Sequence, residues 1–156
     1  MNLSVAVPDL VVVSIAALLL AFSVAPAHAD RCDLMAKQIA AKVGLKTGKR
    51  TPANIRLQPL DPDDDAAYGA HLNCGTNGMS LKYGFLRSLG PPPRGWFVFV
   101  GQTAAVLTGR DANTIAMEVQ RCFEKAQALP RGSFESGYVH CDLDPGGYSL
   151  LLTERG

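Results

Sequence analysis

The sequence predicts an α+β fold, in which an antiparallel sheet of about five to seven strands carries two helices packed on one face. Three observations predict it: two amphipathic helical stretches, several β-rich runs between turn residues, and four cysteines after a segment typical of an export signal. Formal net charge is only +1, which is too balanced to indicate nucleic-acid binding. We therefore expect a small exported domain with no nucleic-acid partner.

The export signal comes first along the chain. Residues 10–24 are an unbroken run of apolar and small residues, and Ala27 and Ala29 occupy the small-residue positions before a cleavage point. Cleavage after Ala29 divides the chain into a signal peptide, residues 1–29, and a single domain, residues 30–156. The alternative is an uncleaved anchor formed by residues 10–24, but crossing the hydrocarbon core takes about 20 residues. We expect a secreted or periplasmic protein that meets the membrane only transiently, during export.

The first predicted helix runs from about Arg31 to Val43. Asp30 can cap its free N–H groups, and Gly44 can supply the left-handed residue that ends it. One apolar stripe follows the helical period: Cys32, Met35, Ile39 and Val43.

A second helix is predicted from about Ala112 to Ala128, with Asp111 as its cap and Pro130 closing the segment. Its apolar stripe consists of Ile115, Val119, Cys122 and Ala126. Each predicted helix therefore carries one cysteine on the stripe that faces the core.

Strands are predicted for the β-rich runs between turn signals: Ile55–Leu57, Tyr68–Cys74, Met79–Phe85, Trp96–Val100, Ala104–Leu107, Tyr138–Leu143 and Tyr148–Thr153. Residues 76–78 and 144–147 are hairpin turns, and the prolines at 91–93 form a stiff connection. Trp96–Val100 is apolar at every position, which favours a central strand buried on both faces. The two halves also share a helix–hairpin plan, so an internal duplication is a hypothesis.

The four cysteines are predicted to form two disulfides, as expected in an oxidising compartment. Three connectivities are open, and we favour Cys32 with Cys74 and Cys122 with Cys141, because each bridge would then hold a helix against its own hairpin. A zinc site is the competing use of the thiols. No Cys-x-x-Cys pair exists, so neither a metal site nor any other cofactor is predicted.

Catalytic candidates are few. His71 and His140 occupy strand positions of opposite parity to the neighbouring cysteines, which predicts that both lie on the sheet face away from the helices, with Tyr138 and Asn73. If the two hairpins are neighbours, these side chains could converge as a polar site for a small hydrolase or a metal-dependent enzyme. The alternative is that they are ordinary solvent-exposed strand residues.

Other catalytic and ligand-binding patterns are absent from the sequence. It contains no Gly-x-Ser-x-Gly elbow, no phosphate-binding loop, and no EF-hand among the acids Asp61, Asp63, Asp64 and Asp65. A carboxylate pair could be drawn only from acids near turns: Glu135, Asp142 and Asp144. We therefore favour a protein that is not an enzyme.

Two surfaces could bind partners. If one sheet face is uncovered by helices, alternate residues such as Phe97, Phe99 and Leu151 would form an apolar contact surface, unless residues 46–65 fold over it. The segment from Lys42 to Arg50 is basic and could bind an anionic envelope polymer or lipid surface through Lys42, Lys46, Lys49 and Arg50.

The favoured function is a non-enzymatic binding module of the cell envelope or exterior, of the inhibitor or immunity type, whose partner is another exported protein. Small size, disulfide bracing and the lack of a catalytic constellation are typical of rigid recognition scaffolds. The enzyme centred on the two histidines and the polymer-binding protein are the alternatives. The sequence does not predict an oligomeric state.

Overall fold

The computed structural model describes residues 24–60 and 69–154 and shows one antiparallel sheet of seven strands. The strands are β1 (Leu45–Arg50), β2 (Asn54–Pro59), β3 (Ala70–Gly75), β4 (Gly78–Leu86), β5 (Ser133–Ser136), β6 (Val139–Asp144) and β7 (Gly147–Thr153), in the spatial order β1-β2-β3-β4-β7-β6-β5. Every neighbouring pair is antiparallel. The predicted class is confirmed.

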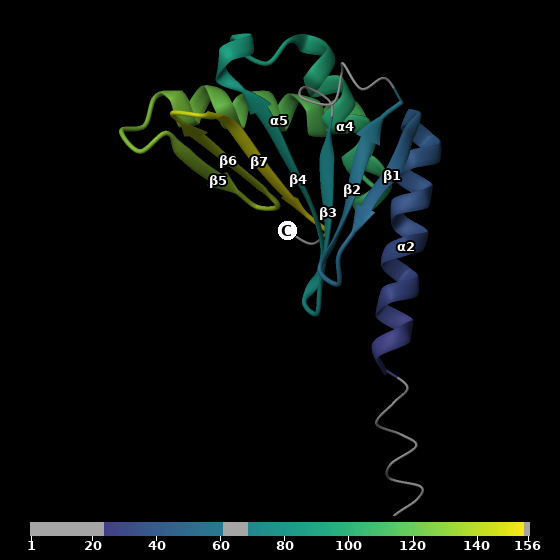
Figure 1. Ribbon diagram of the computed structural model, residues 1–156. Helices are drawn as coiled ribbons and strands as arrows, with labels where there is room; N and C mark the ends of the chain where they lie inside the picture. The colour runs from purple at the N-terminus through teal and green to yellow at the C-terminus, as the bar shows by residue number, and fades with distance from the viewer. Residues whose placement is uncertain (1–23, 61–68, 155–156) are drawn as a thin grey trace, which may run out of the picture.

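The described residues form three α-helices, not two, and these lie on one side of the sheet (Figure 1). They are α2 (Val24–Val43), α4 (Arg94–Thr108) and α5 (Ala112–Gln127), and a short 3₁₀ turn, η2 (Arg87–Leu89), follows β4. No described helix covers the opposite side, which we call the open face (Figure 1). Among the described helices, none is both long enough and apolar enough to span a bilayer.

Helix α4 corrects the prediction of two strands at Trp96–Val100 and Ala104–Leu107. Its buried side chains recur at helical spacing: Trp96, Phe99, Val100, Thr103, Ala104 and Leu107. Gly109 ends the helix in the left-handed conformation, at φ 69°. The expected apolar contact surface is wrong for the same reason, because Phe97 and Phe99 belong to α4 and pack in the helix layer, while only Leu151 lies on the open face.

The boundaries of α2 also differ from the prediction. The helix begins at Val24, so Asp30 lies inside it and is not its cap, whereas Gly44 ends it at φ 71° as predicted. The proposed cleavage point after Ala29 therefore falls within α2, and the signal peptide stays a prediction. The helix of residues 112–127 agrees closely with the sequence, and the Asp111 side chain accepts the N–H of Thr114 at its N-cap.

Both predicted disulfides are confirmed: Cys32 bonds to Cys74, and Cys122 bonds to Cys141. The first joins α2 to the β3–β4 hairpin and the second joins α5 to the β6–β7 hairpin. The two hairpins meet where β4 pairs with β7 at the centre of the sheet. Each half of the sheet is therefore fastened covalently to a helix above it.

The core lies between the sheet and the helices. Trp96 is fully buried there and makes edge contacts with the rings of Tyr83, Phe85 and Phe97. Beside it, the hydroxyl groups of Tyr83 and Thr103 form a buried hydrogen bond of 2.6 Å. Burial raises the pKa of the Tyr83 phenol far above its usual range. A packed core on one face leaves the side chains of the other face to solvent.

Candidate functional site

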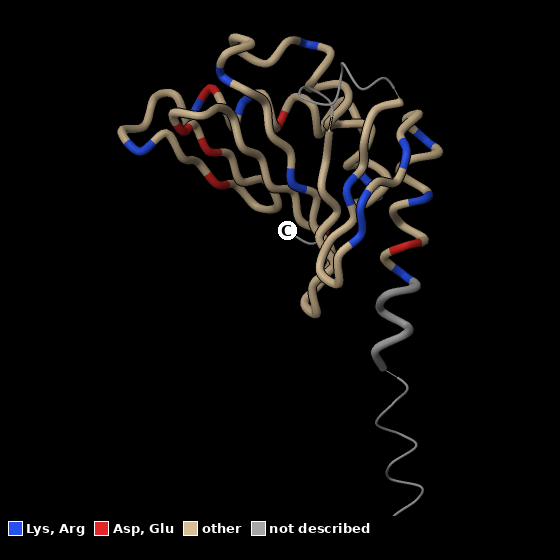
Figure 2. The backbone as a smooth tube through the Cα atoms, viewed as in Figure 1, with Lys and Arg blue, Asp and Glu red and all other residues tan. Residues whose placement is uncertain are grey.

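The open face carries one continuous row of side chains across six strands. Because the strands pair in register, the row can be followed from β2 to β5: Arg56, His71, Lys82, Leu151, His140 and Glu135. Along the chain traces, basic residues occur on β2 and β4 and acidic residues on β6 and β5 (Figure 2). We call Arg56, His71 and Lys82 the cationic half, and Glu135, Asp142 and Asp144 the acidic half.

The two histidines lie on the open face, but the sheet does not bring them together. His71 pairs with Lys82, Lys82 with Leu151, and Leu151 with His140, so two strands separate the histidines. Three strand spacings of about 4.8 Å place them about 14 Å apart. One proton-transfer or metal site cannot include both side chains. Among the described residues, no three metal-binding side chains cluster.

The other members of the predicted histidine site are also dispersed. Asn73 donates to the Ser80 hydroxyl across the β3–β4 hairpin at 3.3 Å. Tyr138 precedes β6 and follows Gly137, whose φ is 57°, and its side chain packs toward α5 on the helix side. The prediction that Tyr138 lies on the face away from the helices is wrong, because β6 begins only at Val139 and Tyr138 does not follow the strand alternation.

The acidic half is largely satisfied internally. His140 Nε2 lies 2.9 Å from Asp142 and its Nδ1 lies 3.5 Å from Glu135. Asp144 Oδ1 accepts the backbone N–H groups of Gly146 and Gly147 in the β6–β7 turn. These carboxylates therefore already have partners within β5, β6 and the β6–β7 turn.

The predicted basic segment is divided between the end of α2 and strand β1. Lys42 lies in the last turn of α2. Lys46 of β1 pairs with Gln58 of β2. Lys49 falls where the register of β1 shifts, and Arg50 forms an ion pair with Asp33 of α2. Basic side chains are common on edge strands such as β1, where they prevent pairing with other chains. The acids at 61 and 63–65 lie outside the described residues.

The cationic half borders a hollow of about 430 Å³ in the open face. Its lining includes Arg56, His71 and Lys82, Gly84 of β4, and one acid, Asp144. A Cβ atom added at Gly84 would meet nothing within 4 Å, and the backbone there is not in the left-handed region. Neither packing nor backbone conformation requires this glycine, which is the pattern seen where a ligand or another chain approaches a strand.

Family models, curated proteins and solved structures were all compared with this chain, and none matches it. Its function therefore has to be argued from its own surfaces.

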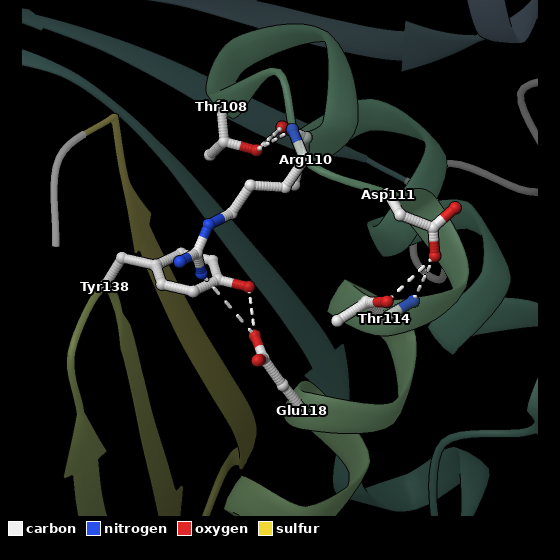
Figure 3. Close-up of polar contacts among 7 residues, drawn as sticks. Thr108, Arg110, Asp111, Thr114, Glu118 and Tyr138 are labelled. Carbon is white, nitrogen blue, oxygen red and sulfur yellow. Dashed lines mark hydrogen bonds and ion pairs between the residues drawn. The ribbon is translucent and has the colours of Figure 1, made fainter.

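A second cavity, the α5 groove, lies between α5 and the β5–β6 hairpin and has a volume of about 500 Å³. At one end the Arg110 guanidinium lies over the Tyr138 ring, 4.1 Å from its centroid, and the Tyr138 hydroxyl donates to Glu118 (Figure 3). Arg110 also reaches Glu118 at 3.8 Å. Burial, and then the hydrogen bond to Glu118, raise the pKa of Tyr138.

The other end of the α5 groove is basic. Arg121 and Lys125 lie one turn apart on α5, and Lys125 Nζ lies 4.7 Å above the centroid of the Phe134 ring. The sequence analysis did not predict this site. Its residues come from α5, from the turn before α5 and from the β5–β6 hairpin, and strand β5 was not predicted. The available signal was the spacing of Glu118, Arg121 and Lys125, which places all three on one side of a helix.

Proposed function

We propose that the protein is a non-enzymatic binding module that holds an acidic segment of another exported protein against the open face. Its role is that of an inhibitor or immunity-type partner. The observation that carries the proposal is the cationic half beside a hollow at Gly84, where an added Cβ atom would meet nothing within 4 Å. Two disulfides tie this sheet to helices on its other side and make it a rigid platform.

The charge distribution favours an acidic occupant over a basic one. Asp142 and Asp144 already interact with His140 and with turn N–H groups, so a basic partner would have to compete with those contacts. Lys82 is exposed and forms no ion pair within the described residues. A carboxylate of the partner therefore gains a charge-assisted contact at Lys82 without displacing an existing one.

The hollow adds shape to this charge. Leu86, which lines it, is half exposed, at 50%, and Leu151 of β7 lies beside Lys82 on the open face. A partner segment with acidic residues beside one apolar side chain would fill the hollow and face the cationic half. Apolar contact at the centre and charge at the rim is the usual arrangement of protein interfaces.

The experiment is affinity capture from an envelope extract with four oxidised baits. These are the unmodified domain, Gly84→Trp, Lys82→Glu and the control Arg94→Glu. Gly84→Trp fills the hollow, and Lys82→Glu reverses its charge. Arg94→Glu makes the same charge change in the first turn of α4, where a negative charge is favourable.

The proposal predicts one partner that is enriched on the unmodified and Arg94→Glu baits and lost from both open-face variants. Equal capture by all four baits would show binding elsewhere and refute it. Self-association that Gly84→Trp abolishes, measured by light scattering of the purified domain, would make a second copy the occupant and also refute the proposal.

A further inference from the structure

We propose that the α5 groove is a second binding site, for a small molecule that carries two anionic groups of the phosphate or carboxylate type. The site is separate from the open face. It lies in the helix layer, and none of its lining residues lines the hollow at Gly84. The proposal therefore stands or falls independently of the proposed function.

The groove holds more positive than negative charge. Three basic side chains line it, Arg110, Arg121 and Lys125, together with two acids, Glu118 and Glu154. Glu154 already accepts a 2.6 Å hydrogen bond from Arg31 outside the groove. Glu118 alone is left to oppose three cations, and the surplus positive charge favours an anionic ligand.

Aromatic rings hold two of these cations in place, and only one of the two, Arg110, also pairs with a carboxylate, that of Glu118. Arg110 lies over Tyr138, at 4.1 Å, and Lys125 lies over Phe134, at 4.7 Å. A ring face attracts a cation without consuming its N–H donors. Lys125 therefore keeps its charge and its N–H donors available to a ligand, and Arg110 keeps those donors that do not face Glu118.

The ion pair between Arg110 and Glu118 in the groove is weak. Arg110 and Glu118 are 3.8 Å apart, and their side chains are 54% and 39% exposed. Exposed pairs with this geometry contribute little to stability. A ligand anion that approaches Arg110 with better geometry can replace Glu118, whose carboxylate keeps the hydrogen bond from Tyr138.

The size and spacing of the groove indicate a small molecule with two charges. Its volume of about 500 Å³ lies within the usual range for small-molecule sites, about 300–1,000 Å³. Arg121 and Lys125 are separated by about 6 Å along the helix axis, and Arg110 lies beyond the N-terminus of α5. Two linked anionic groups suit cations spread along the groove in this way better than a single ion does.

The test uses inorganic pyrophosphate and citrate as separate probes of the oxidised domain, followed by calorimetry and amide NMR. We expect saturable binding of at least one probe, with amide shifts confined to α5 and the β5–β6 hairpin. Arg121→Gln and Lys125→Gln should each weaken binding about tenfold or more, because each removes a charge-assisted contact. Lys82→Gln is the matched control, since it removes one charge from the open face.

The two probes distinguish the ligand chemistry. Binding of pyrophosphate alone assigns phosphate groups, and binding of citrate alone assigns carboxylates; either supports the proposal, as does binding of both. Saturation by neither probe overturns it. Affinity that is unchanged in Arg121→Gln, or that Lys82→Gln lowers equally, also overturns it. Arg121 and Lys125 are exposed on α5, so neither substitution should unfold the domain. Thermal unfolding of each variant checks that the fold is retained.

Discussion

Replacing Gly101 by alanine tests how closely α4 and α5 approach. A Cβ atom at this position would lie 2.2 Å from the carbonyl oxygen of Ala112 and 3.2 Å from the Cβ of Ala116. The two helices would have to separate by about 1 Å to restore ordinary contact distances. Overpacking of this kind costs about 1–3 kcal/mol, and a backbone obstacle places the cost at the upper end.

The intrinsic helix preference acts in the opposite direction. Alanine is more favourable than glycine in a helix interior by about 1 kcal/mol. The net effect of Gly101→Ala is therefore a loss of about 2 kcal/mol in the free energy of unfolding, a large fraction of the total of about 5–15 kcal/mol that is typical of domains. The melting temperature should fall by about 8 °C.

Gly84→Ala is the matched control for this measurement. Its added methyl group meets nothing within 4 Å, so it should stabilise the strand by about 0.5–1 kcal/mol. Both variants should be compared with the unmodified domain by urea and thermal unfolding of the oxidised protein, followed by circular dichroism. Stability of Gly101→Ala at or above that of the unmodified domain would refute the close packing of α4 on α5.

Three further predictions concern the disulfides and two titrating groups. Double serine variants should lose about 3 kcal/mol for the bridge that spans 19 residues and about 4 kcal/mol for the one that spans 42, because longer loops restrict the unfolded chain more; unchanged urea midpoints would contradict this. Hydrogen bonds from Thr114 hold the pKa of Asp111 below its usual value. The ionised Asp111 carboxylate therefore stabilises the folded domain above about pH 4, and this contribution is lost as pH falls through the lowered pKa. Asp111→Asn keeps a capping oxygen that does not titrate. The free energy of unfolding of this variant should therefore fall less than that of the unmodified domain as pH decreases below about 4. An equal fall in both proteins would refute the role of the Asp111 carboxylate. The pKa of Tyr138 is raised. The neutral Tyr138 phenol therefore contributes to folding stability below about pH 10, and this contribution is lost as pH rises through the raised pKa. The stability difference between the unmodified domain and Tyr138→Phe should therefore shrink above about pH 10, and a constant difference would argue against the bond to Glu118.

The sequence predicted correctly those helices and hairpins whose caps, turn residues and apolar periodicity all indicate the same structure. The capped helix beginning after Asp111 and the hairpins at 76–78 and 144–147 appear where the pattern placed them. The cysteine pairing followed from requiring each helix to face its own hairpin. These features depend on short-range chemistry, which a sequence displays directly.

The failures have physical causes. The run from Trp96 to Val100 is rich in β-branched and aromatic residues, and a short apolar run cannot distinguish a buried strand from a buried helix. Extending the window to Leu107 would have shown the helical recurrence of buried positions. Edge strands β1 and β5 were missed because they are polar and short, and they are held by pairing with β2 and β6.

The candidate sites depend on long-range pairing. Alternation placed His71 and His140 correctly on one face, but only the strand order β3-β4-β7-β6 shows that two strands separate them. The α5 groove likewise needs the position of the β5–β6 hairpin relative to α5, which no local pattern contains.

The most direct test of the open face as the binding surface is the affinity of the captured partner for Lys82→Glu and Arg94→Glu, measured over a range of salt concentrations. Both substitutions change the net charge equally, but only the first lies on the open face. Lys82→Glu should weaken binding at least tenfold at low salt, with the difference shrinking as salt screens the exposed charges. Equal affinities of the two variants at every salt concentration would contradict the account.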